Sequence, residues 1–179
     1  MKNKLYLFDA KTVALVGIMA ATLECGKLVL SFLPNIEVVT LLCALYGYVF
    51  GIYGAIAALV FVCIEPLIWG VGSWIITYII YWPLVAILFM LLSRRGVKSR
   101  LILTSVAIGL TLFFGVLSSA IDSAFYLGIN EYYFKNLAIY YIRGVIFYAV
   151  QLACNAALFP TLFMFLKEKL EQIKTNLNL

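Results

Sequence analysis

The stretch SFLPNIEVVTLL, residues 31–42, places a proline, an asparagine and a carboxylate between two long apolar runs. Pro34 is expected to end a helix, because proline lacks a backbone N–H and restricts the residue before it. Asn35 is a good helix N-cap, and Glu37 is favoured near the positive end of a helix dipole. The stretch therefore predicts a short polar turn between two helices.

The composition outside this turn is that of an integral membrane protein. Of the 179 residues, 65% are hydrophobic and only 12% are charged, whereas the surface of a water-soluble domain of this size carries far more charge. The net charge of +5 comes mostly from the chain ends and one loop. It therefore concerns membrane orientation, and no nucleic-acid partner is expected. We predict an all-α, single-domain membrane bundle covering residues 1–179.

The apolar segments predict six membrane-spanning helices, since about 20 apolar residues cross the hydrocarbon layer. Their approximate ranges are 11–33, 37–50, 52–69, 74–93, 100–127 and 136–167. The second and third are short and separated only by FGIYG, residues 50–54, so a five-span arrangement is the main competitor.

Basic residues near the span ends favour the six-span arrangement. Lysines precede the first span, SRRGVKSR (residues 93–100) joins the fourth and fifth, and Lys167, Lys169 and Lys174 follow the sixth. Six spans place all three basic groups on one side, which the positive-inside rule identifies as the cytoplasm. Both termini are then cytoplasmic, and the 31–42 turn faces outward.

Ionisable side chains within apolar spans are costly, so each is a functional candidate. Five occur in the outer parts of four predicted helices: Glu24, Lys27, Glu65, Asp122 and Arg143. Their common depth predicts a cavity that opens outward.

Helical spacing adds polar and aromatic stripes to these charges. The stripes are Glu24, Lys27 and Ser31; Trp74, Tyr78, Tyr81 and Trp82; Ser118, Asp122 and Tyr126; and Tyr140, Arg143, Phe147, Gln151 and Asn155. Aromatic faces with a few fixed polar groups are typical of a site for a flat heterocyclic ligand. The candidate substrate-binding residues are Glu24, Lys27, Asn35, Glu65, Trp69, Trp74, Tyr78, Tyr81, Asp122, Tyr126, Tyr140, Arg143, Gln151 and Asn155.

Structural roles are the alternatives for several of these residues. Trp69 and Trp74 also suit an interfacial aromatic belt. Glu24 and Lys27 are spaced for a structural ion pair, and Arg143 could lock helices together through Asp122 or Glu65. No catalytic residue and no metal site is predicted, because the chain has no histidine and its four cysteines lack metal-ligand spacing.

The first predicted helix also carries small residues in its cytoplasmic half, at Ala14, Gly17, Ala20 and Ala21. Gly17 and Ala21 are four residues apart, a spacing that lets another helix approach closely in a membrane. This stripe is the candidate partner-docking face.

These features together resemble the substrate-binding (S) components of energy-coupling factor (ECF) vitamin transporters. The resemblance extends over essentially the whole chain, through ALVGIMAA (14–21), KLVLSFLPNIEVVTLL (27–42) and GYVFGIYGAIAAL (47–59). The family's first-helix motif usually has two alanines four apart, where this chain has Gly17 and Ala21. The resemblance implies a multi-pass protein of the bacterial cytoplasmic membrane that binds a micronutrient. It also implies docking on a transmembrane coupling protein driven by two cytoplasmic ATPases.

This chain has no Walker-type phosphate-binding loop, so ATP would be used by the partner ATPases and no cofactor is expected in the chain itself. Thiamine-like, pyridoxine-like, deazapurine and corrinoid ligands all remain open. The competing functional interpretations are a membrane-embedded enzyme using Asp122 or Glu65 as a base, and a stand-alone small-molecule carrier.

Overall fold

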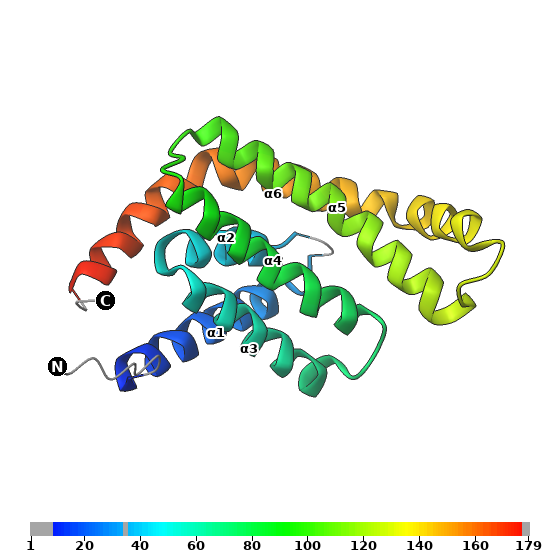
Figure 1. The fold of residues 1–179 in the computed structure, drawn as a ribbon, viewed down its shortest axis with the longest axis horizontal. Coiled ribbons are helices and arrows are strands. Elements are labelled where there is room, and N and C mark those ends of the chain that lie inside the picture. Colours follow the sequence, from blue (N-terminus) through cyan, green and yellow to red (C-terminus); the bar gives the residue numbers. More distant parts are fainter. Residues whose placement is uncertain (1–8, 34–35, 177–179) are drawn as a thin grey trace.

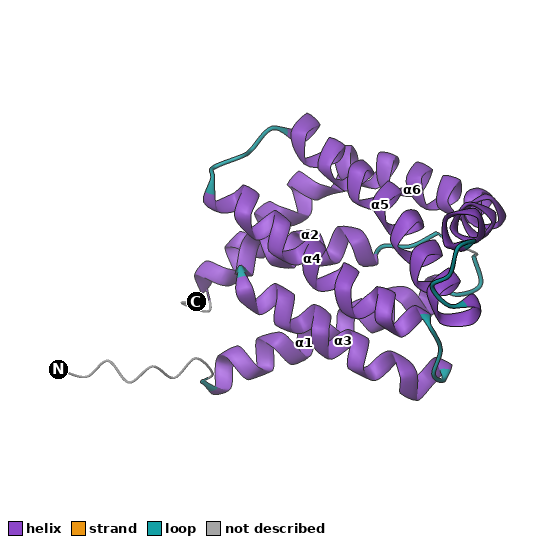
Figure 2. Ribbon diagram, turned by 45° about the vertical axis from the view of Figure 1, so that its right-hand side comes forward, coloured by secondary structure: helices purple, strands orange, loops and turns teal. Residues whose placement is uncertain are grey.

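Six helices form the fold in the computed structural model, which describes residues 9–33 and 36–176. Their bounds are α1 (Ala10–Leu30), α2 (Val39–Phe50), α3 (Ile52–Trp69), α4 (Trp74–Arg94), α5 (Arg100–Leu127) and α6 (Tyr133–Asn176). Every described element is a helix or a loop (Figure 2). The predicted all-α class and the number of helices are therefore confirmed.

Local chemistry explains most helix ends. The Asp9 side chain accepts a hydrogen bond from the Thr12 backbone N–H at 2.8 Å, which starts α1 and lowers the pKa of the Asp9 carboxyl. Gly51, Gly70 and Gly128 follow α2, α3 and α5 with φ between 65° and 79°. Such values suit glycine, which has no Cβ to clash. Helix α1 ends at Leu30, three residues earlier than predicted, and Pro34 and Asn35 lie outside the described residues.

Helix α2 is short and enclosed by its neighbours. Its 12 residues are all buried except Leu42, and at 1.5 Å per residue they extend roughly 18 Å, less than the hydrocarbon thickness of about 30 Å. The other five helices are long and apolar enough to cross a membrane. The predicted second span thus exists as a helix but lacks the length of a span.

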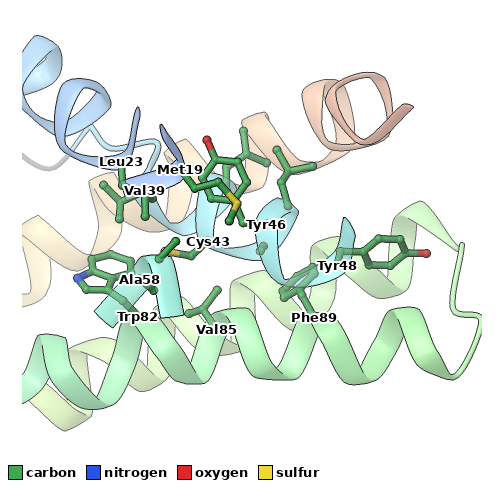
Figure 3. Close-up of a cluster of buried hydrophobic side chains, with 14 of the residues drawn as sticks. Met19, Leu23, Val39, Cys43, Tyr46, Tyr48, Ala58, Trp82, Val85 and Phe89 are labelled. Atoms are coloured by element: carbon green, nitrogen blue, oxygen red, sulfur yellow. The ribbon is translucent and has the colours of Figure 1, made fainter. Parts of the chain in front are cut away.

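Close backbone contacts hold α2 in place. A Cβ added to Gly47 would lie 2.0 Å from the Ala86 carbonyl oxygen of α4, so the two helices touch through their backbones. Side chains of α2 then enter the common core (Figure 3), which includes Leu23, Val39, Cys43, Tyr46, Ala58, Trp82, Val85 and Phe89.

Hydrogen bonds with residues far away in the sequence hold the C-terminal end of α2. Lys174 Nζ of α6 donates to the Val49 carbonyl at 2.7 Å, and Tyr48 Oη donates to the Val97 carbonyl at 2.8 Å. A cation at a helix C-terminus satisfies carbonyls that have no partner within the helix and opposes the dipole. The last turns of α6 therefore belong to the bundle.

The two ends of the bundle differ in charge. The start of α1, the end of α6 and the turn between α4 and α5 lie at one end (Figure 1), and they carry Lys11, Lys174 and the basic 94–100 segment. The end of α1, the start of α2, and the α3–α4 and α5–α6 turns lie at the other end. This is the arrangement that six alternating helices require; the cytoplasmic assignment of the basic end remains a prediction.

Helices α5 and α6 form a long hairpin. Helix α6 has 44 residues, where the sequence predicted a helix over 136–167. The paired end of the hairpin extends past α1–α4 (Figure 1). Large apolar side chains of α6, among them Ile142 and Ile146, are exposed.

Candidate functional site

A cavity of about 410 Å³ lies at the less basic end of the bundle. Its volume is in the range of small-molecule sites. All six helices and the segment between α1 and α2 contribute to its walls. The lining residues are Lys27, Leu30, Ser31, Leu33, Ile36, Glu37, Val39, Trp69, Trp74, Tyr78, Trp82, Phe114 and Gln151.

One wall of the cavity is aromatic. Trp74, Tyr78 and Trp82 are spaced four apart on α4, and consecutive ring centroids lie 5.1 and 5.5 Å apart in edge-to-face pairs. Phe114 of α5 stacks near Trp82 at 6.1 Å. Trp69 comes from the last turn of α3, so all three tryptophans of the chain line the cavity. Three members of the aromatic stripe predicted on α4 therefore face the cavity, and the fourth, Tyr81, does not line it.

The Lys27 side chain extends from α1 to α3 beside the cavity. It forms an ion pair with Glu65, whose side chain is fully buried, while the Lys27 side chain is 25% exposed. Glu24, one turn before Lys27, is buried and interacts electrostatically with both Glu65 and Lys27. Two carboxyl groups and one ammonium therefore meet where α1 packs on α3.

This cluster differs from the i,i+3 pair that the sequence suggested. The described structure gives no hydrogen-bond partner to either Glu24 oxygen or to Glu65 Oε1. Buried carboxyl oxygens are normally satisfied, so each such group requires an explanation. The cluster has acceptor capacity that Lys27 alone does not fill.

Glu37 forms the opposite polar wall. Its carboxylate accepts hydrogen bonds from the Thr40 N–H at 2.9 Å, the Thr40 hydroxyl at 2.6 Å and Asn155 Nδ2 at 3.1 Å. The sequence indicated its role at the start of α2 but not its place in the cavity. Helical spacing placed Asn155 on a polar stripe of α6, but it does not show that Glu37 is its partner.

Some predicted site residues line the cavity, and others are buried in the layer next to its lining. Asn155 is fully buried and reaches the site through Glu37, while its Nδ2 also donates to Thr111 Oγ1 at 3.1 Å. Tyr81 is fully buried in the core beside Trp82 and Phe114. Gln151 does line the cavity, as do Trp69, Trp74, Tyr78 and Lys27. Asn35 lies outside the described residues.

The remaining candidates do not join the cavity lining. Asp122 accepts a hydrogen bond from the Ser73 hydroxyl at 2.6 Å, and Tyr126 Oη lies 3.5 Å from the same hydroxyl. Asp122 therefore tethers the segment before α4. Tyr140 and Arg143 lie in the first half of α6, Arg143 is exposed, and neither lines the cavity. Of the five charges predicted to converge on the cavity, Glu24, Lys27 and Glu65 come together, and of these three Lys27 alone lines the cavity.

Sequence reasoning also left out several lining residues. Ser31 and Trp82 belong to the stripes recognised on their helices, so their omission was avoidable. Phe114 and the apolar residues Leu30, Leu33, Ile36 and Val39 carry no signal of this kind, because their place depends on how the helices pack.

The small residues of α1 point in two directions. Ala14, Gly17 and Ala21 are exposed, and a Cβ added to Gly17 meets no heavy atom within 4 Å. Ala20 is only 1% exposed and packs into the bundle. The accessible part of the predicted docking stripe therefore consists of Ala14, Gly17 and Ala21.

Among the described residues, no group of three or more Cys, Asp or Glu side chains is placed to hold a metal ion. Comparison with known proteins finds no matching family model, no matching curated protein and no matching solved structure.

Proposed function

We propose that this chain is the substrate-binding subunit of an ECF-type transporter and imports a heterocyclic micronutrient. The observation that carries the proposal is the cavity itself. It combines an aromatic wall with buried polar groups at one end of an otherwise apolar helical bundle. This combination suits capture of a flat, hydrogen-bonding solute better than passage of ions.

The exposed small-residue face of α1 supports a partner in the membrane. Ala14, Gly17 and Ala21 leave room for a second helix to approach the α1 backbone. In the proposed assembly this face meets the transmembrane coupling protein, and two cytoplasmic ATPases supply the energy. The protein would be a multi-pass component of the bacterial cytoplasmic membrane, with the cavity facing outward before transport.

Co-purification tests the assembly. The full chain, carrying an affinity tag, should retain a coupling protein and two ATPases when all four are produced together and extracted in mild detergent. Recovery of the tagged chain alone, from cells in which the other three proteins are present, would remove the transporter interpretation.

A second candidate is a membrane-embedded enzyme, which the proximity of Glu24 and Glu65 favours. Two carboxyl groups with different surroundings can divide acid and base roles. Turnover separates the two candidates: mass spectrometry of a small molecule released from the purified chain should show it chemically unchanged for a binding subunit and converted for an enzyme.

A further inference from the structure

The Lys27 ammonium occupies an aromatic cage. Its Nζ lies 5.0 Å from the ring centroid of Tyr78, 5.4 Å from Trp69 and 5.8 Å from Trp74. A cation within about 6 Å of a ring centroid is attracted by the ring quadrupole. Three rings from two helices therefore surround one positive charge, as in proteins that recognise ammonium ligands.

The carboxyl groups around this cage outnumber the cations. Glu65 pairs with Lys27, Glu24 lies beside both, and Glu37 lines the same cavity. Two acids thus accompany one base at the cage, and a third lies across the cavity, where Thr40 and Asn155 already donate to it. Within the described ranges, neither Glu24 oxygen has a donor at hydrogen-bond distance, and the same holds for Glu65 Oε1. The two carboxyl groups lie close enough to interact with each other, and a positively charged nitrogen between them would relieve their mutual repulsion.

Lys27 is also the most easily displaced member of the cluster. Its side chain is partly exposed, whereas Glu65 is fully buried and Glu24 is 8% exposed. A lysine has a flexible four-carbon stem, which can carry the ammonium out toward water while the rings and carboxyl groups stay in place.

We infer that the ligand of this site is an organic cation on a flat ring, whose positive nitrogen replaces the Lys27 ammonium between the aromatic rings and Glu65. The inference rests on the proposed function, since it names the substrate class of the same cavity. An anionic ligand is the less suitable alternative: Lys27 is already paired with Glu65, and Glu37 would repel a second anion.

Three flat pyridine compounds of similar size test the charge preference directly. Isothermal titration of the purified full chain at pH 7 should show 1-methylnicotinamide, a cation, binding roughly tenfold more tightly than neutral nicotinamide, which is the size of a desolvated cation–aromatic contact. Nicotinate, an anion, should bind most weakly. Equal affinities, a preference for nicotinate, or no binding by any of the three would overturn the inference.

Removal of the Lys27 charge should change the binding affinity in opposite directions for cationic and anionic ligands. In Lys27→Met the cage loses its own cation, so 1-methylnicotinamide should bind roughly tenfold more tightly than to the original chain. If Lys27 instead receives an anion, the cation gains nothing and nicotinate loses affinity. Lys135→Met, on the exposed start of α6, is the matched control and should change neither affinity.

A second variant covers the case in which Lys27→Met does not fold, because loss of one partner leaves a buried charge uncompensated. Glu65→Gln should weaken binding of 1-methylnicotinamide by roughly tenfold, and unchanged affinity would count against the inference. The original chain, which needs no substitution, still decides the charge preference. Failure in these titrations while the coupling protein and ATPases co-purify would overturn the substrate class alone; failure of co-purification would overturn the proposed function.

Discussion

Asn155 on α6 donates a hydrogen bond to the Glu37 carboxylate at the start of α2, with 3.1 Å between Nδ2 and Oε1. The two residues are 118 positions apart in the sequence. Their contact connects the last helix of the bundle to the polar turn that covers the cavity. Thr111 of α5 accepts from the same amide group, so Asn155 joins α5, α6 and the segment before α2.

Replacement of Asn155 with alanine should therefore loosen this corner of the bundle. Two hydrogen bonds are lost, and Thr111 Oγ1 loses a partner in a buried place, at a cost of about 1–3 kcal/mol. Thermal unfolding in detergent should show a lower midpoint. Asn136→Ala, on the same helix but partly exposed, should leave the midpoint nearly unchanged. Equal midpoints for both variants would mean that the Asn155 bonds add no stability.

The contact between α2 and α4 makes a sharper stability prediction. Gly47→Ala would place a Cβ 2.0 Å from the Ala86 carbonyl oxygen, and backbone cannot move aside as a side chain can. The helices must separate, at a cost of about 1–3 kcal/mol or more. Folded yield and thermal midpoint should both fall.

Gly109→Ala is the control for Gly47→Ala. Gly109 lies on the exposed face of α5, and a Cβ there meets nothing within 4 Å. Alanine should be neutral or stabilising by up to about 1 kcal/mol, because it favours the helix. Equal behaviour of the two variants would contradict the close packing of α2 on α4.

The sequence predicted the helices well because their ends are encoded locally. Glycines mark the ends of α2, α3 and α5, and the apolar runs between them are long. The burial of α2 was harder to predict, since a 12-residue apolar helix looks the same whether lipid or protein surrounds it. The packed structure distinguishes the two cases, because α2 meets α4 at Gly47 and Ala86 and its residues are buried among the other helices.

The candidate site was predicted in part for a related reason. Helical spacing shows which residues share a face, and it correctly grouped Trp74, Tyr78 and Trp82. It does not show which neighbour that face meets. The spacing allowed Glu24 as an alternative ion-pair partner for Lys27, whereas Lys27 pairs with Glu65 on α3. Arg143 shares a stripe with Gln151, but Gln151 lines the cavity whereas Arg143, two turns earlier on α6, is exposed and does not.

The tether between α5 and the start of α4 gives the third prediction. Asp122 accepts a hydrogen bond from the buried Ser73 hydroxyl, directly before Trp74 of the aromatic wall. Asp122→Ala should make residues 70–76 open more often. Their amide hydrogens should then exchange roughly tenfold faster or more, because the lost free energy is that of a hydrogen bond to a charged group. Hydrogen–deuterium exchange with mass spectrometry measures this difference.

Asp122→Asn distinguishes two roles for Asp122, a hydrogen bond that holds Ser73 in place and a direct ligand contact that needs a negative charge. Asparagine keeps an acceptor oxygen for Ser73, so exchange over residues 70–76 should stay close to that of the original chain. If residues 70–76 exchange at the same rate in Asp122→Ala as in the original chain, Ser73 is held by other contacts. Asp122 would then again be a candidate for direct ligand contact.

The exposed face of α1 gives the last prediction, which concerns the partner. Gly17→Leu should fold normally, because a Cβ at Gly17 has open space around it and leucine favours a helix more than glycine does. The longer side chain should nevertheless prevent a partner helix from approaching the α1 backbone. We expect binding of 1-methylnicotinamide to be unchanged and co-purification of the coupling protein to be lost. Gly109→Leu, equally open but on α5, should keep the partner. A complex that survives Gly17→Leu in full yield would move the docking surface away from α1, whereas loss in both variants would indicate that the bundle tolerates no added bulk toward the membrane.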